Sequence, residues 1–165
     1  MSPFERLLAT DRALAPLVIR LAVAVVMFPH GAQKLFGWFN GGGFSGTRAF
    51  FIETLNIPAP LAYIAIFTEA LAVVGLFIGL LTRPAALGIL SIMVGALILF
   101  PPHGFFMNWS GNQGGEGLEF HLLMIAASLA LIISGGGRAS LDGWLARRMG
   151  ARRSPSSAPG ATAAP

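Results

Sequence analysis

The sequence contains no cysteine and few charged residues. Without cysteine, the chain by itself cannot form a disulfide, a zinc–thiolate site, an iron–sulfur cluster or a thiol redox pair. Only 11% of its 165 residues are charged, whereas a soluble domain usually has about 25%. A soluble domain of this length could not bury 55% hydrophobic residues, because small domains are mostly surface. These features exclude an ordinary soluble enzyme and a disordered chain, and they indicate an integral membrane protein.

Familiar catalytic motifs are also missing. There is no phosphate-binding loop, and the glycines of residues 41–46 do not follow a strand as they would in a dinucleotide-binding unit. No nucleophile–base–acid motif is visible. The net charge of +4 comes mostly from basic residues that flank apolar runs near the chain ends. This placement favours contact with a lipid bilayer and not with nucleic acid.

Four apolar stretches approach the roughly 20 residues that cross a bilayer as a helix. We predict an all-α integral membrane protein in which one domain, residues 1–149, forms a bundle of four transmembrane helices. Their expected ranges are about 13–36, 60–81, 84–100 and 118–134. Pro60 and Pro84 suit helix starts, where a missing N–H costs nothing. Residues 150–165 are rich in proline, serine and alanine, and we expect a disordered tail there.

The arrangement of basic residues predicts the orientation of these spans. Arg20 interrupts the first stretch and no small-x-small cleavage site follows, so we expect a span and not a cleaved signal peptide. With four spans, most arginines share one side with both termini, while only Lys34 and Arg48 lie on the other. Both termini are therefore predicted to be cytoplasmic. The loops 37–59 and 101–117 would face outward, with a short surface helix over 47–55 and aromatic side chains in the interface.

A carboxylate in the second span needs a partner. Glu69 lies roughly 15 Å from the outer end of its helix at 1.5 Å per residue, too far to reach the surface. It must be protonated or paired inside the bundle. The first span offers Arg20, His30 and Lys34 on one face, although Arg20 could instead extend to cytoplasmic headgroups.

Further polar residues lie near the outer ends of the other spans. His103 follows the third span and Glu119 opens the fourth. We therefore expect one outer cavity that gathers five side chains: His30, Lys34, Glu69, His103 and Glu119. His121 points about 200° away from Glu119 on the same helix, and we expect it at the membrane interface.

Three interpretations of this polar cluster remain open. It could be an ion-pair network that fixes helix register, or a pocket for a small ligand or a quinone head. It could also hold a metal, but the sequence has no tight spacing such as His-x-x-x-His, so we predict no metal site. Small residues at Gly75 and Gly79, and along the stripe Gly88, Ser91 and Gly95, favour close helix packing.

Several short motifs occur in a characteristic order along residues 17–145. They are Arg20, His30-Gly31-x-x-Lys34-Leu35, Glu69, Gly79-Leu-x-Thr-Arg83, Glu119 and Gly135-x-Gly137-Arg138-x-Ser140-Leu141-Asp142. In this order and spacing the chain resembles the DoxX family of small four-span bacterial membrane proteins. The resemblance implies a multi-pass protein of the bacterial inner membrane. The chain departs from the family pattern at His121, where an apolar residue is more usual.

The resemblance also suggests candidate site residues and a function. The family looks similar to the small membrane subunit of thiosulfate:quinone oxidoreductase and to a membrane protein needed for methylamine dehydrogenase maturation. By this resemblance, Glu69 is the candidate catalytic residue. The candidate ligand-binding residues are Arg20, His30, Lys34, His103 and Glu119.

The leading hypothesis is an accessory protein or subunit of a quinone-linked membrane oxidoreductase. The chain has no recognisable redox centre, so a partner subunit would carry the electrons. A homo-oligomer is also open. The alternative is a non-enzymatic assembly factor or chaperone whose buried charges are structural. A small solute or proton carrier is a third hypothesis, but the sequence shows no convincing inverted repeat. Whether the protein is an enzyme stays open.

Overall fold

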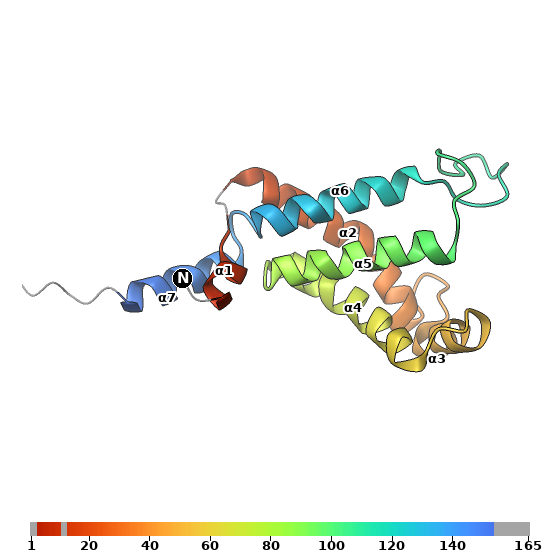
Figure 1. The fold of residues 1–165 in the computed structure, drawn as a ribbon, viewed down its shortest axis with the longest axis horizontal. Helices are drawn as coiled ribbons and strands as arrows, with labels where there is room; N and C mark the ends of the chain where they lie inside the picture. Colours follow the sequence, from red (N-terminus) through yellow and green to blue (C-terminus); the bar gives the residue numbers. More distant parts are fainter. Residues whose placement is uncertain (1–2, 11–12, 154–165) are drawn as a thin grey trace, which may run out of the picture.

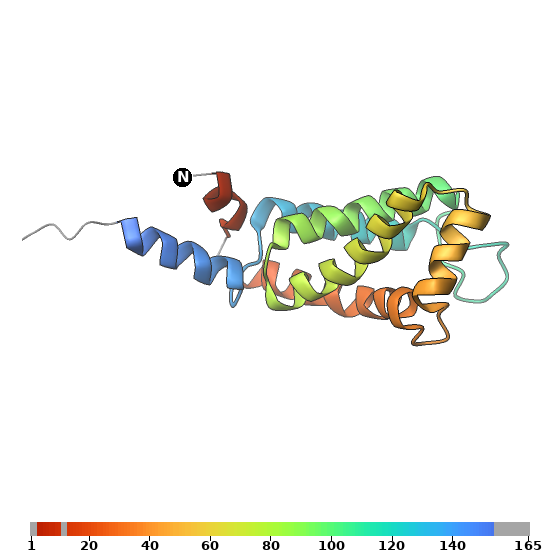
Figure 2. The same cartoon turned by 90° about the horizontal axis from the view of Figure 1, so that it is seen from below.

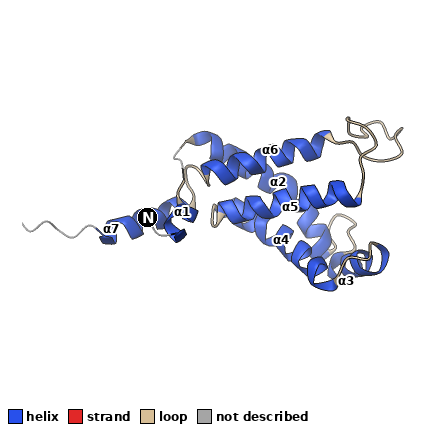
Figure 3. Cartoon of the chain, in the orientation of Figure 1, coloured by secondary structure: helices blue, strands red, loops and turns tan. Residues whose placement is uncertain are grey.

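The computed structural model of the protein describes residues 3–10 and 13–153, and every regular element within them is helical. The elements are α1 (Pro3–Leu8), α2 (Leu14–Phe36), α3 (Gly43–Ala49), the π-helical turn η1 (Phe50–Thr54), α4 (Ala59–Ile78), α5 (Thr82–Leu99), α6 (Glu119–Ser134) and α7 (Leu141–Arg153). Figure 3 shows no strand in this part of the chain. The all-α prediction is confirmed.

Three of these helices have the length and composition to cross a membrane. They are α2, α4 and α5, with 23, 20 and 18 residues. Helix α6 forms at the predicted place and is apolar, but it has only 16 residues. At 1.5 Å per residue it spans about 24 Å, which is less than the roughly 30 Å of a bilayer core. The structure therefore supports three spans by length, and α6 is a shorter apolar helix.

The four longest apolar helices pack around a shared core. Helix α4 contacts α2 and α5, and α6 contacts α5 and α2. The buried side chains between them include Met27, Leu76, Ile89 and Leu131. Large apolar side chains also cover the outside of these helices, and Ile133 is 76% exposed. An apolar exterior of this kind is what helices that contact lipid require.

The polar segments lie at the two ends of this core. Figures 1 and 2 show α1 and α7 at one end, here called the α7 end, with α7 extending away from the other helices. At the opposite end lie α3, η1 and the segment 100–118, and this is called the loop end. Helices α2 and α5 run from the α7 end to the loop end, and α4 and α6 run back.

Some helix bounds differ from those predicted. Helix α4 ends at Ile78 and not at residue 81, because Gly79 adopts a left-handed conformation (φ 69°) that terminates the helix. A helix does form over most of 47–55, as the end of α3 followed by η1. The predicted tail falls mostly outside the described residues, and α7, which the sequence did not predict, includes residues 150–153.

Candidate functional site

An ion pair lies between the middle of α4 and the end of α2. The side chain of Glu69 is 2% exposed, and its Oε1 lies 2.7 Å from Lys34 Nζ, whose side chain is 26% exposed. The ammonium donates a hydrogen bond to the carboxylate. Because a charge inside a bilayer costs a few kcal/mol or more, a buried carboxylate needs such a partner. Of the basic residues that the first span offers, Lys34 is the one paired with Glu69.

The pair forms because α2 and α4 approach each other closely at Gly31. A Cβ atom at this glycine would already be in van der Waals contact with α4, 3.4 Å from the Cα of Ala70. Lys34 follows Gly31 by three residues and lies on the same face of α2. Its side chain therefore reaches directly across to α4.

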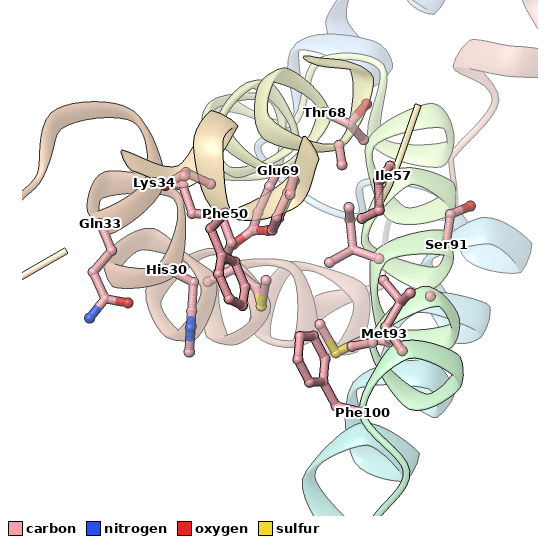
Figure 4. A pocket seen from close by; sticks show the side chains of 18 of the residues that line it. His30, Gln33, Lys34, Phe50, Ile57, Thr68, Glu69, Ser91, Met93 and Phe100 are labelled. Carbon is pink, nitrogen blue, oxygen red and sulfur yellow. The ribbon is translucent and has the colours of Figure 1, made fainter. Parts of the chain in front are cut away.

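A cavity of about 880 Å³ opens beside the ion pair. Its walls come from α2, α4 and α5, with further side chains from α3, η1 and the start of α6, and most of the lining is apolar. Figure 4 shows Lys34 and Glu69 pointing toward one another, with Met93 and Phe100 on the α5 side of the cavity. The cavity therefore has a charged region on one wall and apolar surface over the rest.

Two histidines also line this cavity. His30 lies on α2 near Lys34 and is exposed, and its ring centroid is 6.3 Å from that of Phe120. His121 is half-buried, and its Nδ1 has no hydrogen-bond partner among the described residues. Sequence reasoning missed His121, because its angle from Glu119 was used to place it at the interface. The same angle is consistent with the structure, in which His121 lines the cavity and Glu119 binds the segment 100–118.

Glu119 and His103 do not line the cavity. The Oε1 of Glu119 accepts hydrogen bonds from the backbone N–H of Met107 (2.9 Å) and from Trp109 Nε1 (3.1 Å). The ring of His103 lies against Gly115, where an added Cβ would come within 2.4 Å of its Nδ1. Both residues organise the segment 100–118. The five-residue cluster expected from the sequence is thus reduced to His30, Lys34 and Glu69.

Arg20 lies toward the α7 end, away from the cavity, and is 1% exposed. Its guanidinium donates hydrogen bonds to four backbone carbonyl oxygens, those of Leu76, Phe77, Gly136 and Ala139. These carbonyls lie at the end of α4 and between α6 and α7, where helix ends leave acceptors unpaired. Arg20 neither pairs with Glu69 nor extends to the surface, and it joins three segments of the chain.

Two of the glycine-containing motifs of the sequence, the one that begins at Gly79 and the one that ends at Asp142, meet beside Arg20. Asp142 is 2% exposed and accepts hydrogen bonds from the backbone N–H groups of Leu81 (2.7 Å) and Thr82 (2.8 Å), at the start of α5. A Cβ at Gly79 would lie 2.7 Å from both Arg20 Nη1 and Ser140 Cβ. The absence of a side chain at Gly79 therefore leaves room for the Arg20 guanidinium and for Ser140, just before α7. This role differs from the helix packing expected for Gly79.

The chemistry of the cavity follows from these contacts. Its charged wall offers an ammonium and an imidazole, which can donate hydrogen bonds, and a carboxylate, which accepts them. All three groups can exchange protons. Among the residues that the structure describes, no group of three or more histidine, aspartate or glutamate side chains could hold a metal ion. The arrangement suits a ligand with a polar, hydrogen-bonding head and an apolar remainder.

Comparison with known proteins agrees with this architecture. The profile of the DoxX family matches residues 15–102, which include α4, α5 and all of α2 except Leu14. The chain is 33% identical over 156 residues to an uncharacterised membrane protein of Mycobacterium tuberculosis, covering 88% of this chain and 90% of the relative. It is 28% identical over 129 residues to a Bacillus subtilis protein named "Putative oxidoreductase CatD", covering 78% and 85% respectively. No solved structure matches it. With a matching family profile over more than half of its length, the chain belongs to the DoxX family of membrane proteins.

Proposed function

We propose that this protein binds quinone in the membrane as an accessory protein or subunit of a quinone-linked oxidoreductase. The observation that carries the proposal is the Lys34–Glu69 ion pair on the wall of an apolar cavity of about 880 Å³. Ligand pockets usually have about 300–1,000 Å³ and few polar groups in an apolar lining. A quinone has the matching chemistry, because its two carbonyl oxygens accept hydrogen bonds and the rest of the molecule is apolar.

Three side chains would act on the quinone head. Lys34 has N–H groups left after its bond to Glu69, and one of them would donate to a carbonyl oxygen. Glu69 would take or give a proton at that oxygen, and His30 would supply a second donor from α2. A partner subunit would supply the electrons. The name of the Bacillus relative supports a redox role.

The other candidate residues have structural roles in this proposal. Arg20 is occupied by backbone carbonyls at the α7 end. Glu119 is bound to the backbone and a tryptophan of the segment 100–118. We therefore assign catalysis to Glu69 and ligand binding to Lys34 and His30.

The site can be tested by substitution in a host whose quinone reduction requires this protein. Glu69→Gln should lower the rate of quinone reduction by membranes about 100-fold, the scale of general acid–base catalysis, and Lys34→Ala should also lower it. The matched controls are Glu53→Gln and Arg48→Ala, which remove the same charges at the loop end outside the cavity. If both site variants reach normal abundance in the membrane and keep the wild-type rate, the proposal is refuted.

We also propose that α6 crosses the bilayer together with α2, α4 and α5, and that both termini lie in the cytoplasm of a bacterium. Helix α6 packs beside α5 and α2, and its apolar surface would otherwise meet water. The arginines Arg83, Arg138, Arg147 and Arg148 lie toward the α7 end, which the positive-inside rule assigns to the cytoplasm.

Because the chain has no cysteine, single cysteines report this topology directly. A membrane-impermeant maleimide should label Ser45→Cys and Ser110→Cys in intact spheroplasts. Arg147→Cys should react only after the membrane is opened. Labelling of Ser110→Cys and Arg147→Cys from the same side would show that α6 does not cross.

A second candidate function is that of an assembly factor for other membrane or exported proteins. It is supported by the aromatic side chains at the loop end, where Phe106 is 67% exposed and Trp109 is 85% exposed. A stable client protein that is lost on Trp109→Ala, with quinone reduction unchanged by Glu69→Gln, would favour this function.

A further inference from the structure

Two glycines on one face of α5 have opposite surroundings. Gly88 and Gly95 are seven residues apart, so they lie nearly one above the other on the helix. A Cβ at Gly88 would lie 2.6 Å from Thr68 Cγ2 of α4, whereas a Cβ at Gly95 would have nothing within 4 Å. Helices α4 and α5 therefore touch at Gly88 and separate toward the loop end. Figure 1 shows α4 turning away from α5 in this direction, toward α3.

The cavity extends into this separation and reaches the outside of the protein. Leu61 and Ile64 of α4 line the cavity, although they are 55% and 60% exposed. Leu99 of α5 also lines it and is 42% exposed. These side chains belong to helices that are apolar enough to lie in a bilayer. The opening between α4 and α5 would therefore face lipid, and one continuous cavity joins it to the Lys34–Glu69 pair.

We propose that the opening between α4 and α5 is a channel for the isoprenoid tail of the quinone. The ligand enters sideways from the bilayer, its ring lies at Lys34 and Glu69, and its tail passes Gly95 into the lipid. This inference rests on the proposed quinone function, and it adds the substrate class, namely tailed quinones. The cavity volume supports it, because about 880 Å³ lies near the upper end of ligand pockets and leaves room beyond a single ring.

Gly95 is the residue that determines specificity for the tail. It lines the cavity, and with no atom near its Cβ direction a large side chain there would enter the channel without moving the backbone. Its backbone φ is not in the left-handed region, so an L side chain is not strained there. Ile98 provides the matched control. It lies three residues further along α5, is 73% exposed and does not line the cavity.

The experiment compares a quinone without a tail and one with a tail. Menadione has a bare naphthoquinone ring, and menaquinone-4 carries a geranylgeranyl tail on the same ring. Binding of each is measured to the full chain in nanodiscs, with empty nanodiscs subtracted. The lack of cysteine excludes thiol addition to menadione. Gly95→Trp should weaken menaquinone-4 binding about tenfold or more and leave menadione binding unchanged. Ile98→Trp should change neither.

The outcomes separate this inference from the function on which it rests. If the wild type binds both quinones and Gly95→Trp binds menaquinone-4 normally, the tail channel is refuted and quinone binding stands. Equal weakening of both quinones also refutes a tail-specific role. If the wild type binds neither, the quinone function itself is wrong, and the channel falls with it. Gly95→Leu, a smaller change at the same position, replaces Gly95→Trp if the tryptophan variant does not fold.

Discussion

Replacing Lys34 with methionine removes the partner of the buried Glu69 carboxylate and keeps a side chain of similar length. Glu69 is 2% exposed, and its Oε1 lies 2.7 Å from the ammonium nitrogen. Breaking a buried ion pair by removing one partner costs about 3–5 kcal/mol. Because the Lys34 side chain is 26% exposed, water reaches part of the pair. We therefore expect a cost at the lower end of this range. The free energy of unfolding should fall by roughly 3 kcal/mol.

Glu69→Gln should cost less than Lys34→Met. The ammonium left behind can turn toward the solvent, and the amide oxygen still accepts a hydrogen bond, so the loss should be about 1 kcal/mol. In the double variant no buried carboxylate is left without a partner. Its loss should therefore be smaller than the sum of the single losses by about 1–3 kcal/mol.

Reversible unfolding in mixed micelles, followed by far-UV circular dichroism, measures all three variants. Gln33→Met serves as the control, because Gln33 is adjacent to Lys34 and its side chain donates a hydrogen bond to the carbonyl of Phe39, six residues further along the chain. If the double variant loses as much free energy of unfolding as the two single variants together, the predicted coupling is refuted. Such additivity would mean that the two side chains do not stabilise each other.

Changes away from the cavity test the assigned structural roles in the same unfolding assay. Arg20→Lys should lose about 1–3 kcal/mol, because an ammonium cannot reach all the carbonyls that the guanidinium joins, and an unchanged stability would contradict this role. Asp142→Asn should lose about 1–3 kcal/mol, because its NH₂ group would face a backbone N–H donor, and full stability would show that the carboxylate is dispensable. Gly79→Ala should be destabilised by more than about 1 kcal/mol by its left-handed φ and its contact with Arg20. Gly95→Ala should be neutral or up to about 1 kcal/mol more stable, and an equal loss at both glycines would contradict this contrast.

Hydropathy located the apolar helices well because lipid solvation leaves a strong signal in sequence. Helices α2 and α6 begin at Leu14 and Glu119, one residue from the positions predicted. The end of α4 was misplaced, because the apolar run continues through Leu80 and Leu81 while the backbone turns at Gly79. Hydropathy does not report that turn, and it gives no sign that a side chain at Gly79 would collide with Arg20 and Ser140.

The environment of Arg20 could not be predicted from the helix face alone. Arg20 and Lys34 share a face of α2, but they are 14 residues apart, or about 21 Å along the axis. Only Lys34 is level with Glu69. The acceptors of Arg20 are backbone carbonyls. Because every residue has a backbone carbonyl, the sequence does not indicate which ones the arginine contacts. The motifs drew attention to Gly79 and Asp142. That the two residues contact each other could be seen only in the tertiary structure, where the Asp142 backbone N–H donates to the Gly79 carbonyl.

The positions of Glu119 and His121 depended on the segment 100–118. The sequence shows that both residues open the last apolar helix, but not which of them the preceding segment covers. In the structure that segment folds back so that Trp109 and Met107 donate to Glu119. This leaves His121 on the cavity side. The angular spacing on the helix correctly predicts that Glu119 and His121 point in different directions. The sequence analysis expected Glu119 in the cavity, whereas His121 lines it.

The central claim is that a quinone ring binds beside Lys34 and Glu69, and photocrosslinking tests it most directly. A photoreactive azidoquinone is bound to the protein in nanodiscs, irradiated, and its attachment sites are mapped by mass spectrometry. We expect attachment to cavity residues such as Met27, Glu69 and Met93, and protection of these sites by excess menaquinone-4. Attachment confined to lipid-facing residues such as Leu71 and Ile98, without protection by the competitor, would contradict it.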